Sequence, residues 1–164
     1  MRSRVRKEVL KIFRQSFESQ YPGFTLIEGP DAYCAVWSME IASGVYGCVA
    51  LIFLRTNDSF LIELGWSPLN EFPWDFDSSR NNYKLPEGRV RMGELWNRGG
   101  TEVEWDLAPE TFQGDEIESW GDPPLETVLP RIEPTVKDCL KRFQKYGVRY
   151  FNKVANARGL GDVL

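Results

Sequence analysis

Residues 33–66 constrain the fold more than any other part of the chain, because they have the pattern of three consecutive antiparallel strands. Side chains alternate between apolar and polar over 33–41. Ser43-Gly44 is a two-residue hairpin signal, since glycine supplies the backbone conformation that such turns need. The 45–54 stretch is almost uninterrupted in apolar residues, which is typical of a central strand covered on both faces. Alternation resumes over 59–66. The sequence therefore predicts an antiparallel meander with 45–54 in the middle.

The N-terminal part predicts a helix followed by a short strand. Apolar residues recur every three or four positions over 3–20, which indicates an amphipathic helix. Tyr21-Pro22-Gly23 is expected to end it, because proline cannot continue the helical hydrogen bonds. Residues 24–28 then fit a short edge strand that leads towards the meander.

Beyond the meander, strands at 89–96 and 101–107 are expected on either side of Gly99-Gly100. Residues 67–87 are rich in proline and asparagine and predict a long loop. An acidic linker is expected over 108–123.

The C-terminal part predicts helices that are interrupted by proline. Apolar residues keep helical spacing from Leu125 to Phe143, but Pro130 and Pro134 lie within that pattern. We therefore expect a short helix up to Leu129 and a second helix that begins near Pro134. Gly147 is expected to cap the second helix, and residues 148–157 to form a third.

Together these elements predict an α+β fold, with an N-terminal helix and C-terminal helices packed on an antiparallel sheet. The 164 residues are expected to form a single domain, 1–164, because a chain of this length can bury a core of its own. No apolar run approaches the roughly 20 residues that a membrane span needs. We therefore expect no membrane association.

The chain contains no histidine, which limits the catalytic and metal-binding chemistry available to it. It excludes Ser-His-Asp and Cys-His nucleophiles, and every metal site that needs an imidazole. The chain offers no phosphate-binding loop and no recognisable catalytic motif. The sequence therefore favours a non-enzymatic protein, with no catalytic residues and no cofactor.

The three cysteines indicate a reducing compartment. They form no CxxC pair, and their number is odd. A register set by the Ser43-Gly44 turn would place Cys34 opposite Phe53 and Met39 opposite Cys48, so Cys34 and Cys48 would not be bridged. We expect reduced thiols and a cytoplasmic protein.

Charge is segregated along the chain, although the net charge is only −4. Residues 2–14 and 131–158 are basic, whereas residues 99–130 contain nine acidic residues and no lysine or arginine. Either these are solvated helix faces and an acidic loop, or they form a functional charge pattern. Nucleic acid is disfavoured as a partner, because its binders normally have a basic balance. The sequence does not indicate an oligomeric state.

Glu63 is the acidic residue most in need of a partner. The register expected from the second turn puts it opposite Ile52, on an apolar face shared with Leu61, Trp37 and Met39. A carboxylate there is costly unless it is paired. Arg89 and Arg91 are two residues apart, so they share a face if they lie on a strand.

Two interpretations of this group follow. An ion pair from Glu63 to Arg89 or Arg91 would fix the order of the strands. Alternatively, the arginines would hold an anion in a small-ligand pocket, or Glu63 and Glu94 would form the acid–base pair of a carboxylate-based enzyme. The sequence alone does not bring Glu63 and Glu94 together.

A second candidate group is aromatic and acidic. The aromatic residues would either fold over the sheet as a lid or form a recognition surface rimmed by acids, since interface anchors are often tryptophan. Asp75 and Asp77 supply only two carboxylates, without the further ligands of a calcium loop, so we expect no metal site. The candidate binding residues are Trp66, Phe72, Trp74, Asp75, Phe76 and Asp77.

The spacing of aromatic and arginine residues resembles a known family. FLIELGWS, a following FPW, then GRVRMGELW and a later WDL are similar to small bacterial domains of unknown function of the DUF4304-like kind, over about residues 10–110. Some of those domains are encoded near toxin genes. The resemblance implies a binding role, as in an immunity protein, and transfers no catalytic residue.

These observations lead to one functional expectation and one alternative. We expect a cytoplasmic binding protein, of the immunity type, that recognises a basic protein partner through the 66–77 loop and the acidic 102–122 segment. The alternative is a small-ligand-binding protein or carboxylate-based enzyme that uses Glu63, Arg89, Arg91 and Glu94.

Overall fold

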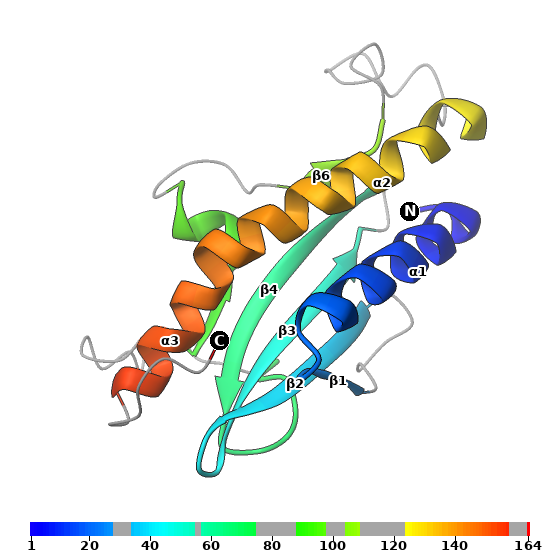
Figure 1. The fold of residues 1–164 in the computed structure, drawn as a ribbon. Helices are drawn as coiled ribbons and strands as arrows, with labels where there is room; N and C mark the ends of the chain where they lie inside the picture. The colour runs from blue at the N-terminus through cyan, green and yellow to red at the C-terminus, as the bar shows by residue number, and fades with distance from the viewer. Residues whose placement is uncertain (28–33, 55–56, 75–87, 98–103, 109–123, 158–163) are drawn as a thin grey trace.

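An antiparallel sheet lies at the centre of the computed structural model, and its first five strands are neighbours in chain order (Figure 1). The structure describes residues 1–27, 34–54, 57–74, 88–97, 104–108, 124–157 and 164. Strand β6 pairs with the beginning of β4, on the edge that β5 occupies further along. The strands are β1 (Thr25–Ile27), β2 (Cys34–Ala42), β3 (Val45–Phe53), β4 (Ser59–Ser67), β5 (Arg89–Arg91) and β6 (Trp105–Asp106).

The predicted meander is confirmed, with β3 between β2 and β4. The Ser43-Gly44 turn is also as expected, with Gly44 at a φ of 66° and Ala42 opposite Val45. The short edge strand predicted at 24–28 is present as β1, which pairs only with β2 in the described part of the sheet.

The predicted register of β2 on β3 is wrong by one residue. The pairing shifts between Glu40 and Ala42, so that Cys34 lies opposite Ile52 and Ser38 lies opposite Cys48. Such a bulge adds a residue to one strand and turns the side chains beyond it to the other face. Trp37 therefore points towards the helices.

The predicted register of β4 on β3 is wrong by two residues. Glu63 lies opposite Ala50, not Ile52, and Phe60 lies opposite Phe53. A shift of two preserves the face, so Glu63 still shares a face with Leu61. It does not share one with Trp37 or Met39, because the bulge has moved those side chains to the other side.

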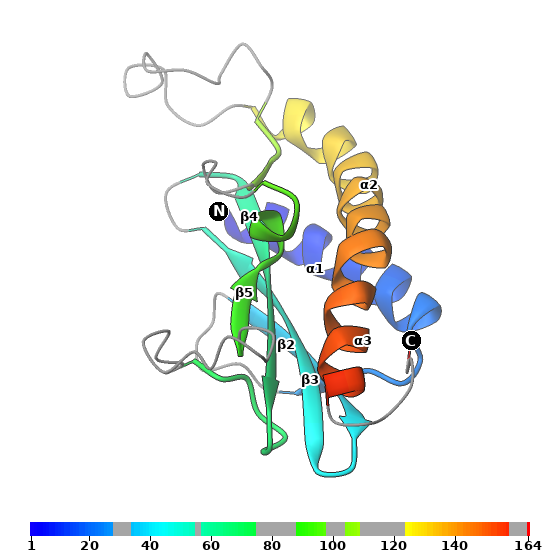
Figure 2. The same ribbon diagram turned by 90° about the vertical axis from the view of Figure 1, so that its left-hand side faces the viewer.

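The three α-helices of the described residues lie on one face of the sheet (Figure 2). They are α1 (Ser3–Gln20), α2 (Leu125–Arg142) and α3 (Val148–Ala157). This arrangement confirms the predicted α+β fold. None of the helices in the described ranges is both long and apolar enough to cross a membrane.

Helix α1 forms where the sequence predicts it, because its apolar residues make one stripe. Val5, Val9, Phe13 and Phe17 are spaced by four and are all buried. The rings of Phe13 and Phe17 lie 5.2 and 5.6 Å from that of Trp37 on β2. The main core therefore lies between the sheet and the helices.

The predicted break in the C-terminal helices is wrong. Helix α2 runs through both Pro130 and Pro134. Each proline removes one backbone hydrogen bond. The buried stripe of α2 continues past both of them through Val128, Ile132, Val136, Cys139 and Leu140, so packing on the sheet outweighs that loss.

The predicted cap at Gly147 is also wrong. The chain continues from α2 through a π-helical turn, η5 (Phe143–Gly147), directly into α3. An added Cβ on Gly147 would lie 2.5 Å from Cδ2 of Phe143, so glycine serves here for close packing and not to end a helix.

Two predicted strands are shorter than expected. The strand predicted at 89–96 is β5 over its first three residues and then the short 3-10 helix η2 (Met92–Leu95). Of the strand predicted at 101–107, β6 covers Trp105–Asp106, while 101–103 lie outside the described residues. Most of the predicted 67–87 loop and 108–123 linker also lies outside them.

Candidate binding surface

The sheet face opposite the helices, here called the second face, carries a small apolar cluster. Val36, Cys48 and Ala50 are buried there on β2 and β3, and Phe72 is buried against them. Phe72 belongs to the stretch that follows β4, residues 68–74, here called the 68–74 segment. This segment therefore covers part of the second face. The cluster is flanked by four half-buried residues, Ile27, Tyr46, Ile52 and Trp74.

Glu63 lies on the second face and is paired with both predicted arginines. The residue is almost fully buried, at 2% exposure. Arg89 Nε donates to Glu63 Oε2 at 2.6 Å, and Arg91 Nε donates to Glu63 Oε1 at 3.3 Å. Register explains the contact, since Glu63 is opposite Arg91 and neighbouring Gly65 is opposite Arg89. The predicted ion pair is confirmed.

Arg89 also contacts the 68–74 segment. Its Nη1 donates to the main-chain oxygen of Trp74 at 2.7 Å. The guanidinium lies 5.8 Å from the ring centre of Phe72 and 5.6 Å from that of Trp74. The two rings are themselves in contact, 4.5 Å apart. The structure thus joins the Glu63–arginine group and the aromatic group, which the sequence presented as separate candidates.

Gly65 lets this segment approach the sheet closely. A Cβ at this position would lie 2.7 Å from Cγ of Pro73, closer than real side chains come. Pro73 stands between Phe72 and Trp74 in the sequence. Any larger residue at position 65 would therefore displace the segment that carries both rings.

The remaining predicted binding residues are not all in this group. Trp66 is half-buried on β4 and packs against the main core between the sheet and the helices. It therefore faces away from Phe72 and Trp74. Asp75, Phe76 and Asp77 lie outside the described residues, as does most of the acidic 102–122 segment.

Glu94 differs from Glu63 in its burial and in the element that carries it. It is exposed on η2, whereas Glu63 is buried on β4 between two guanidinium groups. Both oxygens of the Glu63 carboxylate already accept hydrogen bonds from arginine side chains. The arrangement suits a structural anchor better than an acid–base pair.

The buried thiols are not activated. Burial raises the pKa of Cys48 to about 11, and the nearby charge of Glu71 acts in the same direction. Burial also raises the pKa of Cys139. Both are therefore neutral thiols at physiological pH and weak nucleophiles. Within the described ranges no group of three or more acidic or cysteine side chains could hold a metal ion.

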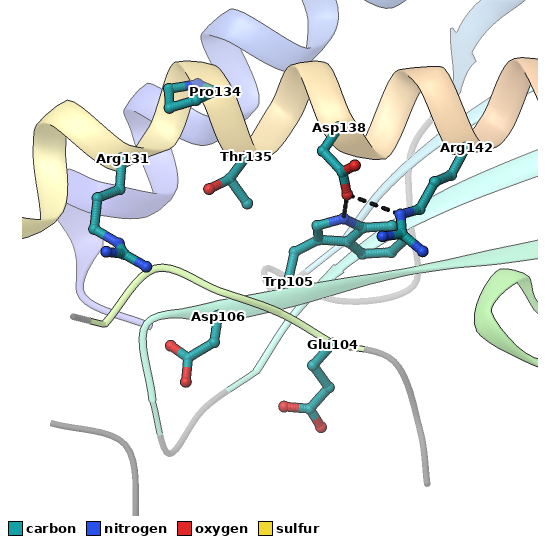
Figure 3. Close-up of a pocket in the computed structure, with 8 residues that line it drawn as sticks. All are labelled: Glu104, Trp105, Asp106, Arg131, Pro134, Thr135, Asp138 and Arg142. Carbon is teal, nitrogen blue, oxygen red and sulfur yellow. Dashed lines mark hydrogen bonds and ion pairs between the residues drawn. The ribbon is translucent and has the colours of Figure 1, made fainter. Parts of the chain in front are cut away.

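A groove on the helix side of the sheet was not predicted from the sequence (Figure 3). It has a volume of about 500 Å³ and lies between β6 and α2. The lining residues on α2 share one helical stripe, namely Arg131, Thr135, Asp138 and Arg142. The sequence did not indicate this stripe, because a helix break was expected at Pro134. The lining residues are Glu104, Trp105, Asp106, Arg131, Pro134, Thr135, Asp138 and Arg142.

One end of this groove is fixed by Asp138. Its Oδ2 accepts hydrogen bonds from Trp105 Nε1 at 3.1 Å and from Arg142 Nε at 2.8 Å (Figure 3). The Trp105 ring stacks on Phe60, and Arg142 lies 5.1 Å from the ring centre of Trp96. These side chains are therefore held by the protein itself.

Comparisons with known proteins do not assign the chain to a family. No protein-family model, no curated protein and no solved structure matches it. The function is therefore argued from the geometry.

Proposed function

We propose that the chain is a non-enzymatic, cytoplasmic binding protein of the immunity type, which recognises a basic protein partner. The partner surface in this proposal consists of the 68–74 segment on the second face, together with the acidic residues that follow it in sequence. Glu63, Arg89 and Arg91 are its support and not a catalytic group.

The contact of Arg89 with Trp74 carries the proposal. Arg89 is held by the buried Glu63 at one side and contacts the Phe72 and Trp74 rings at the other. A loop held in this way loses little conformational entropy when a partner binds.

The exposed parts of the segment combine apolar and acidic character. Leu69 is 58% exposed, and Glu71 is exposed beside the buried Phe72. Trp74 is half-buried, so part of this residue is accessible. Asp75 and Asp77 follow directly in sequence. Apolar anchors next to acidic side chains suit a partner with a basic surface.

The alternative small-ligand or enzymatic role for Glu63, Arg89, Arg91 and Glu94 has less support. Both Glu63 oxygens already accept hydrogen bonds from arginine, and Arg89 also binds the Trp74 carbonyl. A pocket for an anion would need guanidinium groups that are not already engaged in this way.

Substitution of Trp74 by alanine tests the surface. Proteins encoded beside this gene, starting with the basic ones, are purified and titrated with the wild-type chain by calorimetry. With the partner found in this way, Trp74→Ala should weaken binding by about 2 kcal/mol or more, roughly 30-fold in Kd, as expected for an interface anchor. The circular dichroism spectrum should stay that of the wild type.

Two leucines provide a matched control. Leu69→Ala removes an exposed side chain from the segment and should also weaken binding. Leu26→Ala removes an exposed leucine from β1 and should leave Kd unchanged. Equal effects of the two leucine variants, or unchanged binding by Trp74→Ala, would contradict the proposed surface. The immunity assignment fails if none of the neighbouring gene products binds.

The acidic residues are expected to act on the rate of association. Asp75→Asn combined with Asp77→Asn should lower the association rate constant and reduce its dependence on salt, because these charges steer a basic partner. Stopped-flow measurements at two salt concentrations provide this comparison. An effect confined to the dissociation rate would argue against steering.

A further inference from the structure

The helices are basic, although the chain as a whole is acidic. Helices α1, α2 and α3, with the π-helical turn between α2 and α3, contain twelve basic and five acidic residues. The rest of the chain contains eight basic and nineteen acidic residues. The net charge of −4 is therefore an average over positive helices and a negative remainder, and it does not describe the surface that the helices present.

The excess of positive charge is largest where α2 continues into α3. Residues 139–157 contain five basic residues and no acidic one. One of the five, Arg142, pairs with Asp138. The other four are exposed, recur every four positions and form no ion pair with a described residue. These four, here called the basic row, are Lys141, Lys145, Arg149 and Lys153.

The π-helical turn η5 keeps the basic row in line. An α-helix turns by about 100° per residue, so side chains four residues apart drift by about 40° at each step. In an uninterrupted α-helix, Lys153 would therefore lie about 120° around the axis from Lys141. A π-helical turn accommodates one extra residue, which takes back about 100° of this drift. The row is therefore nearly straight along the continuous rod of α2 and α3 (Figure 1).

The basic row offers charge without apolar anchors. The exposed large apolar side chains of the described residues are Leu26, Leu69 and Leu164, and none of them is on a helix. Protein interfaces and helices that lie on membranes both depend on such side chains. A surface without them suits a partner that is recognised by its charge.

The aromatic rings beside the row are already in contact with other side chains. The ring centre of Tyr146 lies 5.0 Å from that of Trp96 and 5.0 Å from Lys145 Nζ. Arg142 lies 5.1 Å from the ring centre of Trp96. Proteins that bind single-stranded nucleic acids stack the bases on free rings. A duplex exposes its phosphates and needs no such ring, so it suits this surface better.

We infer that the basic row binds the phosphate backbone of a nucleic-acid duplex without reading its sequence, a site separate from the proposed partner surface on the second face. From Lys141 to Lys153 the row spans about 18 Å, the length of about five base pairs. A single line of cations matches a line of phosphates more closely than a plane of lipid headgroups. The acidic remainder of the chain limits the affinity and makes it depend strongly on salt.

The salt dependence of binding measures the number of phosphate contacts. A fluorescent DNA duplex of about 16 base pairs is titrated with the protein between about 50 and 200 mM salt, and binding is followed by anisotropy. Four contacts predict a slope of about −3.6 in log K against log salt, so Kd should rise roughly 100-fold over this range. No saturable binding at the lowest salt concentration would overturn the inference.

Further duplexes test whether the backbone is the ligand. A second DNA duplex of unrelated sequence should bind within about twofold of the first, because phosphate contacts carry no sequence information. A preference of tenfold or more for one sequence, at roughly the discrimination of a base contact, would contradict backbone recognition. An RNA duplex of the same length is titrated beside them, and the tighter duplex identifies the kind of nucleic acid.

Two matched double variants test the residues. Lys145→Gln with Arg149→Gln removes two charges from the row, so it should weaken binding at least about tenfold and reduce the steepness of the salt slope by about two. Lys11→Gln with Arg14→Gln removes two exposed charges from α1 that already pair with glutamates of the same helix, and it should leave the slope nearly unchanged. Equal effects of the two variants would show that only net charge matters and would overturn the inference.

Three other probes separate the classes of partner. Single-stranded DNA of the same length, poly-glutamate and vesicles that contain phosphatidylserine are titrated under the same conditions. The duplex should bind more tightly than each of them. Tighter binding of the single strand would overturn the duplex assignment. Tighter binding of poly-glutamate would indicate an acidic protein partner, and tighter binding of the vesicles a membrane surface, and either result would overturn the inference.

Discussion

Glu63 connects several parts of the second face. Through Arg91 and Arg89 it connects β4 to β5, and through Arg89 it reaches the main-chain oxygen of Trp74. A buried carboxylate is stable only while its donors stay in place. The arginines that Glu63 needs as donors therefore hold β5 next to β4 and also position the Phe72 and Trp74 rings.

Replacement of Glu63 by glutamine should be destabilising. The amide keeps the shape of the side chain, but it has no charge and turns an NH₂ donor towards guanidinium donors. We expect the free energy of unfolding to fall by about 1–3 kcal/mol, measured by urea denaturation. Glu94→Gln, at an exposed glutamate, should change it by less than about 0.5 kcal/mol. Equal effects of both substitutions would show that the Glu63 ion pairs add nothing.

At the residue scale, the sequence predicted the ion pairs of Glu63 but not the hydrogen bond from Arg89 to the 68–74 segment. A lone acid on an apolar strand and two arginines two residues apart are recognisable signals. The bond from Arg89 to the Trp74 carbonyl has no such signal, because the acceptor is a main-chain atom in an irregular segment.

At the scale of elements, the C-terminal helices show tertiary packing overriding local rules. Pro130, Pro134 and Gly147 are all signals that end helices in isolation. In the folded chain the buried stripe of α2 and the contact between Gly147 and Phe143 favour continuation. The β2 bulge is another case, because nothing in the local sequence marks the extra residue that turns Trp37 to the helices.

Gly147→Ala should destabilise the protein, although alanine is the better helix former. Helix propensity favours alanine by about 1 kcal/mol. Its Cβ would lie 2.5 Å from Cδ2 of Phe143. That ring cannot move easily, because it is buried against Phe17 and Tyr21. Overpacking typically costs about 1–3 kcal/mol, so we expect a net loss in the free energy of unfolding.

Gln144→Ala is the matched control for this prediction, because Gln144 is exposed in the same π-helical turn. It should change the free energy of unfolding by less than about 0.5 kcal/mol. In a double-mutant cycle, Phe143→Leu should reduce the cost of Gly147→Ala, since the smaller side chain leaves room for the added methyl group. A Gly147→Ala variant as stable as the wild type would contradict the steric explanation.

At the scale of the whole molecule, the sequence predicted the sheet and the helices packed on it, but it did not predict the groove between β6 and α2. The apolar β3 strand required cover on both faces, and the structure provides helices on one and the 68–74 segment on part of the other. The groove depends on contact between β6 and α2, which are far apart in sequence and meet only through the fold. The expected break at Pro134 divided the stripe that would have indicated it.

The two buried thiols should make the stability of the whole molecule depend on pH. Cys48 lies on the second face and Cys139 on the helix side, and burial raises the pKa of both. Above pH 9 the unfolded chain loses these protons while the folded chain keeps them. Their contribution to stability is therefore fully present below pH 9 and is lost as pH rises towards 11, the pKa of Cys48.

Urea denaturation at pH 8, 9, 10 and 11 measures this loss. The free energy of unfolding should decline above pH 9 by up to about 1.4 kcal/mol per pH unit for each thiol. The Cys48→Ala, Cys139→Ala double variant should decline less steeply, whatever its stability at pH 8. Burial also raises the pKa of Tyr21, but that phenol is present in both proteins, so the difference in slope belongs to the thiols. Equal slopes in the two proteins would mean that these thiols ionise in the folded chain as readily as in the unfolded one.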